Sequence, residues 1–515
     1  MAALPPVPPE PPAVQTARWL LRPIAFMESC RRRLGDPFGV KLLGFESPLY
    51  MVSDPDAIRA LYTGRGHGLP PGRRAALLPM VGSRSLLLLE GRDHLARRRV
   101  MLPPFHGERM RAYESIMRDA ALAELERWPA GAAFPLHPSM QAITLEVILR
   151  AVFGVTDDDR RSRLAARLRG LLDATSSPML QFAVLLSRRI GKVDPLVQVR
   201  AVRGEIDALL YEEIAERRRD PHAGDRDDIL SMLAGARFED RGGMSDAELR
   251  DQLMTLLLAG HETTATALAW TFDLLTRHPQ ALERLTRELD AGEQTYLRAV
   301  IAESLRMRPV VGLAGRRLAG ELRVGDYTLP PGSDLTPAIW LTHTRADLYP
   351  EPYAFRPERF LGRPPETYAW IPFGGGMRRC LGAAFAELEM RVVLETVLRH
   401  RTLRPASPHA EHVVRRNVTF SPRHGTRVHA TARPAASRRA GGLDSRGAHA
   451  QGAAHAPDVA EVGGAAHAPD VAEVGGAADA TEVTAEVGGN GAHTAEVGGN
   501  GAHTAGPPRT TLPRP

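Results

Sequence analysis

The chain has 515 residues, of which 43% are hydrophobic and 24% are charged, close to the averages for globular proteins. These values exclude collagen-like and wholly disordered chains, and no apolar run approaches the roughly 18 residues that a transmembrane helix needs. Two cysteines, Cys30 and Cys380, are too few for a disulfide framework or a zinc ribbon. The first residues also lack the layout of a secretory signal. We therefore expect a globular cytoplasmic protein without a membrane span.

The formal net charge of +6 is unevenly distributed along the chain. Residues 433–515 contain six Arg and nine Asp or Glu, so the positive charge lies in residues 1–432. The basic residues are nearly all arginines, and they are scattered among acidic residues with few aromatic residues beside them. This pattern is typical of a solvated surface rather than of a nucleic-acid interface, and we expect no nucleic-acid partner.

Composition divides the chain into three regions. Residues 1–17 begin with a Pro-rich stretch and are expected to be flexible. Residues 18–432 have apolar residues three and four apart over long segments, interrupted by short strand-like runs, and predict a domain that is mainly α with small β-sheets. Residues 433–515 contain short repeats without Leu, Ile or aromatic residues, which cannot build a core. We expect this tail to be disordered.

The predicted elements of the domain can be placed in chain order. Strand-like runs cover residues 39–43, 48–52, 321–324 and 427–430, and helical patterns cover residues 110–128, 143–153 and 201–217. The clearest helix covers residues 246–278, because Ser245 and Glu248 have the spacing of a capping box and Pro279 marks its end. At about 1.5 Å per residue this helix would cross a whole domain. We expect it to be the central helix.

Glycines precede Cys380 in the segment 370–382, Trp-Ile-Pro-Phe-Gly-Gly-Gly-Met-Arg-Arg-Cys-Leu-Gly, and a helical pattern starts at Leu381. Free amides at the start of that helix would favour the thiolate form of Cys380. A phosphate-binding loop is disfavoured because the Gly-Lys-Ser/Thr sequence is missing. A nucleophilic cysteine with a distant His partner stays open. A third interpretation, that Cys380 is an axial thiolate ligand of haem iron, also stays open. It needs glycines, a shielding aromatic ring and a cation nearby.

The segment 373–382 resembles the haem-binding signature of the cytochrome P450 monooxygenases. The specified positions of that signature are occupied by Phe373, Gly376, Arg378, Cys380 and Gly382. The resemblance covers about residues 18–432 and implies the cytochrome P450 fold, with the long central helix over haem. It also implies haem b, iron protoporphyrin IX, as the cofactor and Cys380 as the metal ligand.

Further motifs of the family follow in the family's order. Glu303 and Arg306, with Arg359 downstream, are implied to form a buried ion network that supports the fold. The resemblance also implies that the haem is bound by residues from four parts of the chain: His94, Arg98, Ala259, Gly260, Arg316, Phe373, Gly374, Arg378, Cys380 and Gly382. Within this set the carboxylates of the haem are assigned to His94, Arg98, Arg316 and Arg378, since cations bind carboxylates.

The segment 259–264, Ala-Gly-His-Glu-Thr-Thr, lies in the middle of the predicted central helix. A zinc-protease motif is excluded because Ala265 stands where the second His is required. The two threonine hydroxyls could simply bond to carbonyls one turn earlier. The resemblance implies instead that Glu262 and Thr263 are catalytic. Together they would form an acid–alcohol pair that opens the helix locally and passes protons to bound oxygen.

The resemblance implies a haem-thiolate monooxygenase that hydroxylates or epoxidises a hydrophobic small molecule, such as a fatty acid, terpenoid or polyketide, with O2. The chain has no dinucleotide fingerprint or Fe–S cysteine cluster, so electrons are expected from a ferredoxin or flavodoxin with its reductase. We expect a monomer. A peroxide-driven peroxygenase and a non-catalytic haem-thiolate sensor or carrier remain as alternatives.

The segments expected to line the substrate pocket are apolar. They contribute Leu77, Leu78, Met80, Val81, Met179, Leu180, Phe182, Leu185, Val310, Val311, Leu313, Val418 and Phe420.

Overall fold

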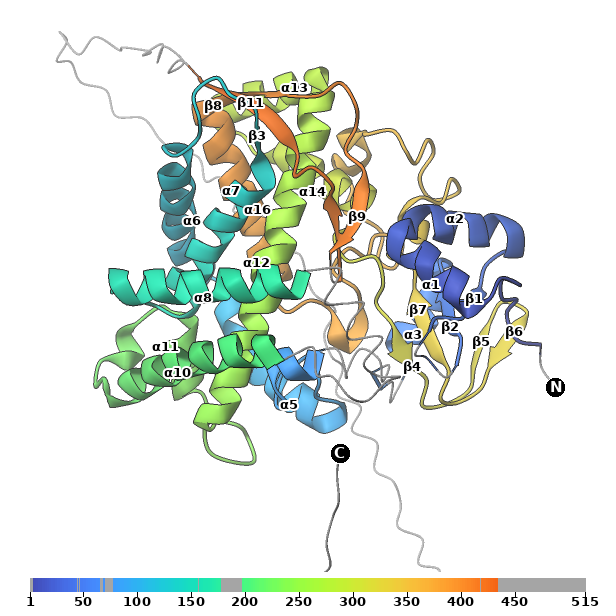
Figure 1. Cartoon of the computed structure of the whole chain (residues 1–515), viewed down its shortest axis with the longest axis horizontal. Helices are drawn as coiled ribbons and strands as arrows, with labels where there is room; N and C mark the ends of the chain where they lie inside the picture. The colour runs from blue at the N-terminus through green and yellow to red at the C-terminus, as the bar shows by residue number, and fades with distance from the viewer. Residues whose placement is uncertain are drawn as a thin grey trace, which may run out of the picture. The chain divides into compact units, whose positions relative to one another are not determined.

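A computed structural model describes residues 3–433 except 44, 46, 65–67, 70–76, 156, 177–196 and 417. Helices dominate this part of the chain, which confirms the predicted class, mainly α with small β-sheets (Figure 1). The α-helices are α1 (Pro12–Leu21), α2 (Pro23–Leu34), α3 (Pro55–Thr63), α5 (Gly91–Met101), α6 (Arg109–Leu125), α7 (Leu136–Val147), α8 (Asp158–Ser176), α10 (Val197–Arg219), α11 (Ile229–Gly235), α12 (Asp246–Arg277), α13 (Pro279–Asp290), α14 (Thr295–Met307), α15 (Ile339–His343) and α16 (Ala383–His400). Shorter helical pieces are η1 (Pro103–Phe105), η2 (Ile148–Val152), η3 (Ala223–Asp225), η4 (Pro357–Phe360) and η5 (Gly376–Arg378).

The strands form small sheets at the edges of the helical body. They are β1 (Phe38–Val40), β2 (Leu49–Val52), β3 (Phe134–Pro135), β4 (Arg316–Arg317), β5 (Leu322–Val324), β6 (Tyr327–Leu329), β7 (Asp334–Pro337), β8 (Arg401–Pro405), β9 (Val413–Arg416), β10 (Thr419–Pro422) and β11 (Arg427–Ala432). The order β1-β2-β7-β4 makes a mixed sheet in which only β2 and β7 are parallel. The remaining strands pair antiparallel as β3-β11-β8, β10-β9 and β5-β6. The predicted strands correspond to β1, β2, β5 and β11.

Helix α12 is the predicted central helix, and its predicted bounds are confirmed to within one residue. The Ser245 hydroxyl accepts from the Glu248 N–H, and the Glu248 carboxylate accepts from the Ser245 N–H, so the capping box is present. Pro279 begins α13 directly after it. In Figure 1, α12 runs between the helices α6, α7, α8, α10 and α11 on one side and the N-terminal helices with the mixed sheet on the other. It packs against α7, α10, α14 and α16.

The start of the chain differs from the flexible segment predicted over residues 1–17. Helix α1 begins within this segment, and Gln15, which is buried, donates from its amide to the Pro8 carbonyl at 3.1 Å. The Gly39 N–H donates to the Pro6 carbonyl at 2.8 Å. Proline lacks an N–H, but its carbonyl still accepts, so a Pro-rich stretch can be bound to a domain through acceptors alone.

Cys30 is buried among apolar side chains of α1, α2 and β1, as predicted for an ordinary small apolar residue. Burial raises the pKa of its thiol to about 11. The predicted tail, apart from Arg433, lies outside the described residues. Within the described residues, no helix combines the length and the apolar composition that a membrane span requires.

The predicted ion network on α14 is confirmed. Arg306 donates to the two carboxylate oxygens of Glu303 at 2.7 and 2.8 Å, and both side chains are fully buried. Arg359 on η4 places its Nε 3.4 Å from Glu303 Oε1. Arg306 also donates to the carbonyls of His343 and Pro352, at 2.8 Å each. One buried carboxylate therefore balances two guanidinium groups and links α14 to η4, while Arg306 links α14 to α15.

Replacing Glu303 by Gln should lower the free energy of unfolding by about 3–5 kcal/mol, because the Arg306 guanidinium would stay buried without an anion. Chemical denaturation of the purified variant measures this loss. Asp56→Asn is the matched control, since Asp56 pairs with Arg59 at 3.0 Å on the exposed face of α3. It should change stability by less than about 1 kcal/mol. Equal effects of the two changes would contradict the prediction.

Candidate functional site

Cys380 lies in a loop between η5 and α16. The loop closes on itself because the Cys380 N–H donates to the Phe373 carbonyl at 2.9 Å. The Phe373 ring packs edge-on against Trp370, with ring centroids 6.0 Å apart. Helix α16 begins at Ala383, two residues later than predicted. The sulfur therefore sits before the first turn of α16.

Backbone geometry and close packing explain why this loop has three glycines. Gly374 and Gly376 have φ angles of +68° and +63°, in the left-handed region that favours glycine. A Cβ at Gly375 would lie 2.4 Å from the ring of Tyr62, and one at Gly376 would lie 2.4 Å from the Tyr62 carbonyl. The glycines thus allow α3, which carries Tyr62, to approach the loop.

The Cys380 side chain is partly enclosed by protein and partly exposed. Surrounding protein desolvates the thiol and so raises its pKa, while the Gly382 N–H, Arg98 and Arg379 lower it. The residue nevertheless keeps exposed surface. A Cβ at Gly382, two residues after Cys380, would meet no atom within 4 Å beyond its chain neighbours, so the space beside Gly382 is open. Burial outweighs the effect of the helix end on which the sequence prediction of a thiolate depended. A thiolate here needs a cation in contact with it, and a metal ion supplies one.

Four predicted carboxylate-binding residues come together near this loop. His94 on α5 is buried, and its pKa is lowered to about 4, mainly by burial and then by the charges of Arg378, Arg98 and Arg316. Arg98 donates to the Arg379 carbonyl at 2.8 Å, which links α5 to the Cys380 loop. Three separate chain segments therefore place cations within electrostatic reach of His94.

Arg316 and its neighbour Arg317 have different surroundings. Arg317 pairs with Asp334 on β7, with Nε and Oδ1 2.8 Å apart. Arg316 is buried, and its guanidinium lies 5.4 Å from the ring centroid of Tyr62. Among the described residues, neither Arg316 nor Arg98 forms an ion pair with a carboxylate. The structure thus brings Arg316, and not Arg317, to His94.

These features fit a flat dianionic group that carries a metal ion. Buried cations repel one another unless an anion lies between them, and two carboxylates would supply that anion. The open side of Cys380 would face the metal. Among the described residues, no cluster of three or more His, Cys, Asp or Glu could hold a metal ion. Haem meets all of these conditions.

The middle of α12 is open, whereas the rest of the helix is mostly buried. Ala259 is exposed and Thr263 is partly exposed. The Thr263 hydroxyl donates to the Ala259 carbonyl at 2.6 Å, and α12 is continuous through this turn. The bond one turn earlier is thus present, and no opening of the helix is seen. A Cβ at Gly260 would lie 3.2 Å from Ile148 Cδ1, so Gly260 allows close packing of η2.

Glu262 turns its carboxylate toward α7. The Gln141 amide donates to Glu262 Oε2 at 2.6 Å. His137 Nε2 lies 3.7 Å from Glu262 Oε1 and 3.1 Å from the Thr266 hydroxyl. Burial lowers the pKa of His137 to about 3, so its imidazole is neutral near pH 7. Glu262, the acid of the predicted acid–alcohol pair, is therefore held by two neutral side chains of α7.

Sequence reasoning missed Gln141 and His137. Neither belongs to a motif, and both lie more than a hundred positions before Glu262, so only the packing of α7 on α12 identifies them. It also missed Glu389 on α16, which is buried and hydrogen-bonded to Thr264. Burial raises the pKa of Glu389 well above its usual range.

The predicted pocket residues have mixed positions. Val81 is buried beside Leu88 and Leu69, with Leu77 and Met80 packed against them. Phe420 packs instead into the core formed by the N-terminal helices. Val418 is 59% exposed. The residues between 179 and 185 lie outside the described residues.

A separate cleft of about 620 Å³ does not belong to this site. It is lined by Ile116, Glu146, Arg150, Gly154, Val155, Arg161, Arg226, Asp227 and Asp228. Its charges neutralise one another: Arg161 lies 3.4 Å from Glu146, and Arg226 lies 2.9 Å from Asp228. We interpret it as a solvated groove.

Comparison with known proteins gives one consistent result. Residues 5–420 match the family model for cytochrome P450. The chain is 41% identical over 434 residues to cytochrome P450 135B1 of Mycobacterium tuberculosis, covering 82% of this chain and 91% of the relative. It is 38% identical over 440 residues to cytochrome P450 138 of the same organism, covering 83% and 97%.

Solved structures agree on the fold. A retinoic-acid-bound cyanobacterial CYP120A1 matches with a TM-score of 0.71 and 25% identity, covering 84% of this chain and all of that chain. The haem domain of cytochrome P450DA matches with a TM-score of 0.73 and 23% identity, covering 84% and 99%.

Replacing Arg98 by Met should raise the pKa of His94 above about 4 in the haem-free protein, because one of the charges that lower it is removed. Burial and the two remaining arginines should keep it below 6.5. NMR titration of histidine-labelled protein measures the shift. Arg99→Met is the matched control, since Arg99 is 70% exposed on the same helix and pairs with Glu239. An unchanged His94 pKa in Arg98→Met would contradict the cation cluster.

Proposed function

Because this chain belongs to the cytochrome P450 family and is a haem-thiolate monooxygenase, we propose that it inserts oxygen from O2 into a hydrophobic small molecule with electrons from a separate redox partner. Hydroxylation and epoxidation are the proposed reactions. The observation that carries the proposal is the open side of Cys380 next to the cation cluster around His94.

We assign haem b as the cofactor. Cys380 would bind the iron through sulfur, and His94, Arg98, Arg316 and Arg378 would bind the carboxylates. Covalent attachment would need further cysteines, but Cys30 lies in a different core. When bound, haem supplies the chemistry of oxygen activation, and the protein supplies position and protons. Phe373, Gly374, Gly382, Ala259 and Gly260 would contact the ring.

Proton supply is assigned to Glu262 and Thr263. The Thr263 hydroxyl lies at the open turn of α12, where it can exchange its bond to the Ala259 carbonyl for one to a water molecule. Glu262 is one residue away, and Gln141 holds its carboxylate toward α7. We propose that Glu262 takes protons on the α7 side and releases them toward Thr263 by a change of rotamer.

Electrons are proposed to come from a ferredoxin or flavodoxin with its reductase. The positive charge of residues 1–432 would attract an acidic carrier. Exposed Arg379 and Met377, in the Cys380 loop, would offer it a basic and apolar contact. A monomer in the cytoplasm stays our prediction.

The substrate is proposed to be apolar, in the range of fatty acids, terpenoids and polyketides. The side chains beside the open turn of α12 are aliphatic: Leu258 packs with Val81 and Leu88. One similar solved structure holds retinoic acid, an apolar carboxylic acid. A peroxygenase is the second candidate. It would not need the acid–alcohol pair, and the Gln141 bond that positions Glu262 favours the monooxygenase.

Purified protein loaded with haem should form product from O2 when a ferredoxin, its reductase and NADPH are present, and much less from hydrogen peroxide alone. A library of fatty acids, terpenoids and polyketides, screened by spectral shift, would identify the substrate for this assay. Cys380→Ala should abolish the spectrum of thiolate-bound haem, whereas Cys30→Ala should keep it. Product from peroxide at the same rate would favour the peroxygenase, and haem binding without turnover by either route would favour a sensor or carrier.

Thr263→Ala should keep haem but divert electrons into hydrogen peroxide, lowering product per NADPH by roughly tenfold or more, since proton transfer would lose its donor. Gln141→Leu should act in the same direction more weakly. The ratio of product to NADPH measures both. Thr271→Ala is the control, because the Thr271 hydroxyl makes the same bond, to the Ala267 carbonyl at 2.9 Å, in a buried turn. Full coupling in Thr263→Ala would refute the proton role.

A further inference from the structure

Residues 79–89, which we call the strap, connect the helical turn before α5 to the rest of the site. Both ends are bound through backbone carbonyls. Arg203 on α10 donates to the Pro79 carbonyl at 2.6 Å, and Arg378 in the Cys380 loop donates to the Leu89 carbonyl. The strap thus lies between α10 and the loop that carries the sulfur.

Side chains of α12 satisfy the backbone of the strap. The Gln252 amide oxygen accepts from the Leu86 N–H at 2.9 Å, and its nitrogen donates to the Arg84 carbonyl at 2.6 Å. The Asp251 carboxylate accepts from the Arg84 N–H at 2.9 Å. Gln252 is fully buried. It therefore acts toward the strap as a neighbouring strand would, with one donor and one acceptor.

The strap approaches α12 closely. The Ser85 hydroxyl lies 2.6 Å from the Thr255 hydroxyl, one turn after Gln252. A Cβ at Gly82, whose φ is +83°, would lie 2.1 Å from the Asp251 carboxylate. Contacts from Asp251, Gln252 and Thr255 therefore fix the separation of strap and helix.

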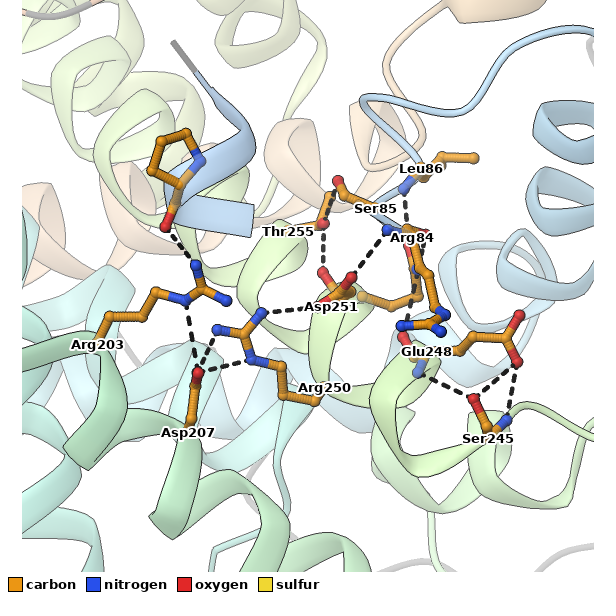
Figure 2. Close-up of polar contacts among 12 residues, drawn as sticks. Arg84, Ser85, Leu86, Arg203, Asp207, Ser245, Glu248, Arg250, Asp251 and Thr255 are labelled. Atoms are coloured by element: carbon orange, nitrogen blue, oxygen red, sulfur yellow. Dashed lines mark hydrogen bonds and ion pairs between the residues drawn. The ribbon is translucent and has the colours of Figure 1, made fainter. Parts of the chain in front are cut away.

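An ion chain links this contact to α10. Arg250 donates to Asp251 at 2.7 Å and to Asp207 at 2.6 Å, and Arg203 Nε lies 3.5 Å from Asp207 (Figure 2). The Arg250 side chain is 2% exposed. Removing either acid would leave a buried guanidinium short of an anion and threaten folding. Gln252 is neutral, so it allows the contact to be tested without this complication.

The strap packs apolar side chains against Leu258 of α12. Val81 and Leu88 are buried, and Leu87 and Leu258 pack against them. Leu258 directly precedes Ala259, the exposed residue of α12. The separation of strap and helix therefore sets the position of an aliphatic wall around Leu258, one residue before the proposed oxygen-activating turn.

We propose that Gln252 is a specificity-determining positioning residue, which fixes the distance between this aliphatic wall and α12 and so selects substrates by length. Gln252 touches no substrate itself and acts through the strap. The proposal rests on the proposed function, because it takes the open turn of α12 to be where substrate meets haem.

The test compares two ligands of haem iron. N-Methylimidazole is too small to reach the strap, whereas N-dodecylimidazole extends along the aliphatic wall. In Gln252→Met the Leu86 N–H and the Arg84 carbonyl lose their partner, and the wall is no longer fixed. The Kd of N-dodecylimidazole should then rise roughly tenfold, because its binding would have to order a wall that Gln252 no longer holds, while that of N-methylimidazole should not change.

Hydrogen exchange resolved to single amides provides a second measurement, and it does not depend on haem. The Leu86 amide should exchange faster in Gln252→Met. The Arg84 amide should change less, because its N–H donates to the Asp251 carboxylate. Ser85→Ala removes the adjacent hydroxyl bond and should show the same trend more weakly if Gln252→Met folds poorly. Gln294→Met is the matched control, since Gln294 bonds to Glu395 at 2.8 Å between α14 and α16.

Equal changes of both Kd values, or no change of either, would overturn the proposal and leave Gln252 a structural residue. Failure of the proposed function is distinguishable from this result. In that case the unaltered protein would give no spectral shift with N-methylimidazole, whereas failure of the proposal about Gln252 requires that shift to be intact.

Discussion

The site depends on bringing like charges together in a region from which water is largely excluded. His94 comes from α5, Arg316 from β4 and Arg378 from the Cys380 loop, and burial, together with this positive charge, lowers the pKa of His94 to about 4. Such a cluster is unfavourable unless an anion completes it. Two contacts hold the loop beside α3 and α5: the loop glycines allow Tyr62 of α3 to approach, and Arg98 of α5 donates to the Arg379 carbonyl. In the proposed function, a dianionic ring with iron at its centre would turn this unfavourable arrangement into a binding site.

Local sequence patterns predicted much of the fold and identified the loop that carries Cys380. The capping box at Ser245 and Glu248, with Pro279 as a stop, defined α12 because helix ends depend on nearby residues. The spacing around Cys380 identified the loop. The contacts that orient the site were not predictable, because they join distant segments without a local signal: Gln141 reaches Glu262 across 121 positions. The N-terminal segment was misjudged for the same reason. Its proline carbonyls accept hydrogen bonds from Gln15 and from the distant Gly39 N–H, which no local pattern indicates.

Helix α12 serves three purposes along its length, and its side chains change accordingly. The first turns carry charged and amide groups that bind the strap and α10 (Figure 2). The middle is open at Ala259 and Thr263, where small side chains leave space. The last turns are apolar and pack into the main core, with Trp270 donating to the Phe420 carbonyl at 2.7 Å. A single rigid element thus keeps the strap and the open turn in a fixed relation.

The contact between Gly82 and Asp251 restricts how this protein can diversify. A methyl group at position 82 would overlap a carboxylate that is already bound to the strap and to Arg250, so the backbone would have to retreat from α12. Libraries that aim to alter the choice of substrate should therefore keep this pair and vary Met80 or Leu87, whose side chains are only partly buried. Evolution faces the same restriction: a lineage can change the side chains of the wall one at a time, but a side chain at position 82 would overlap Asp251 and would be strained at a φ of +83°.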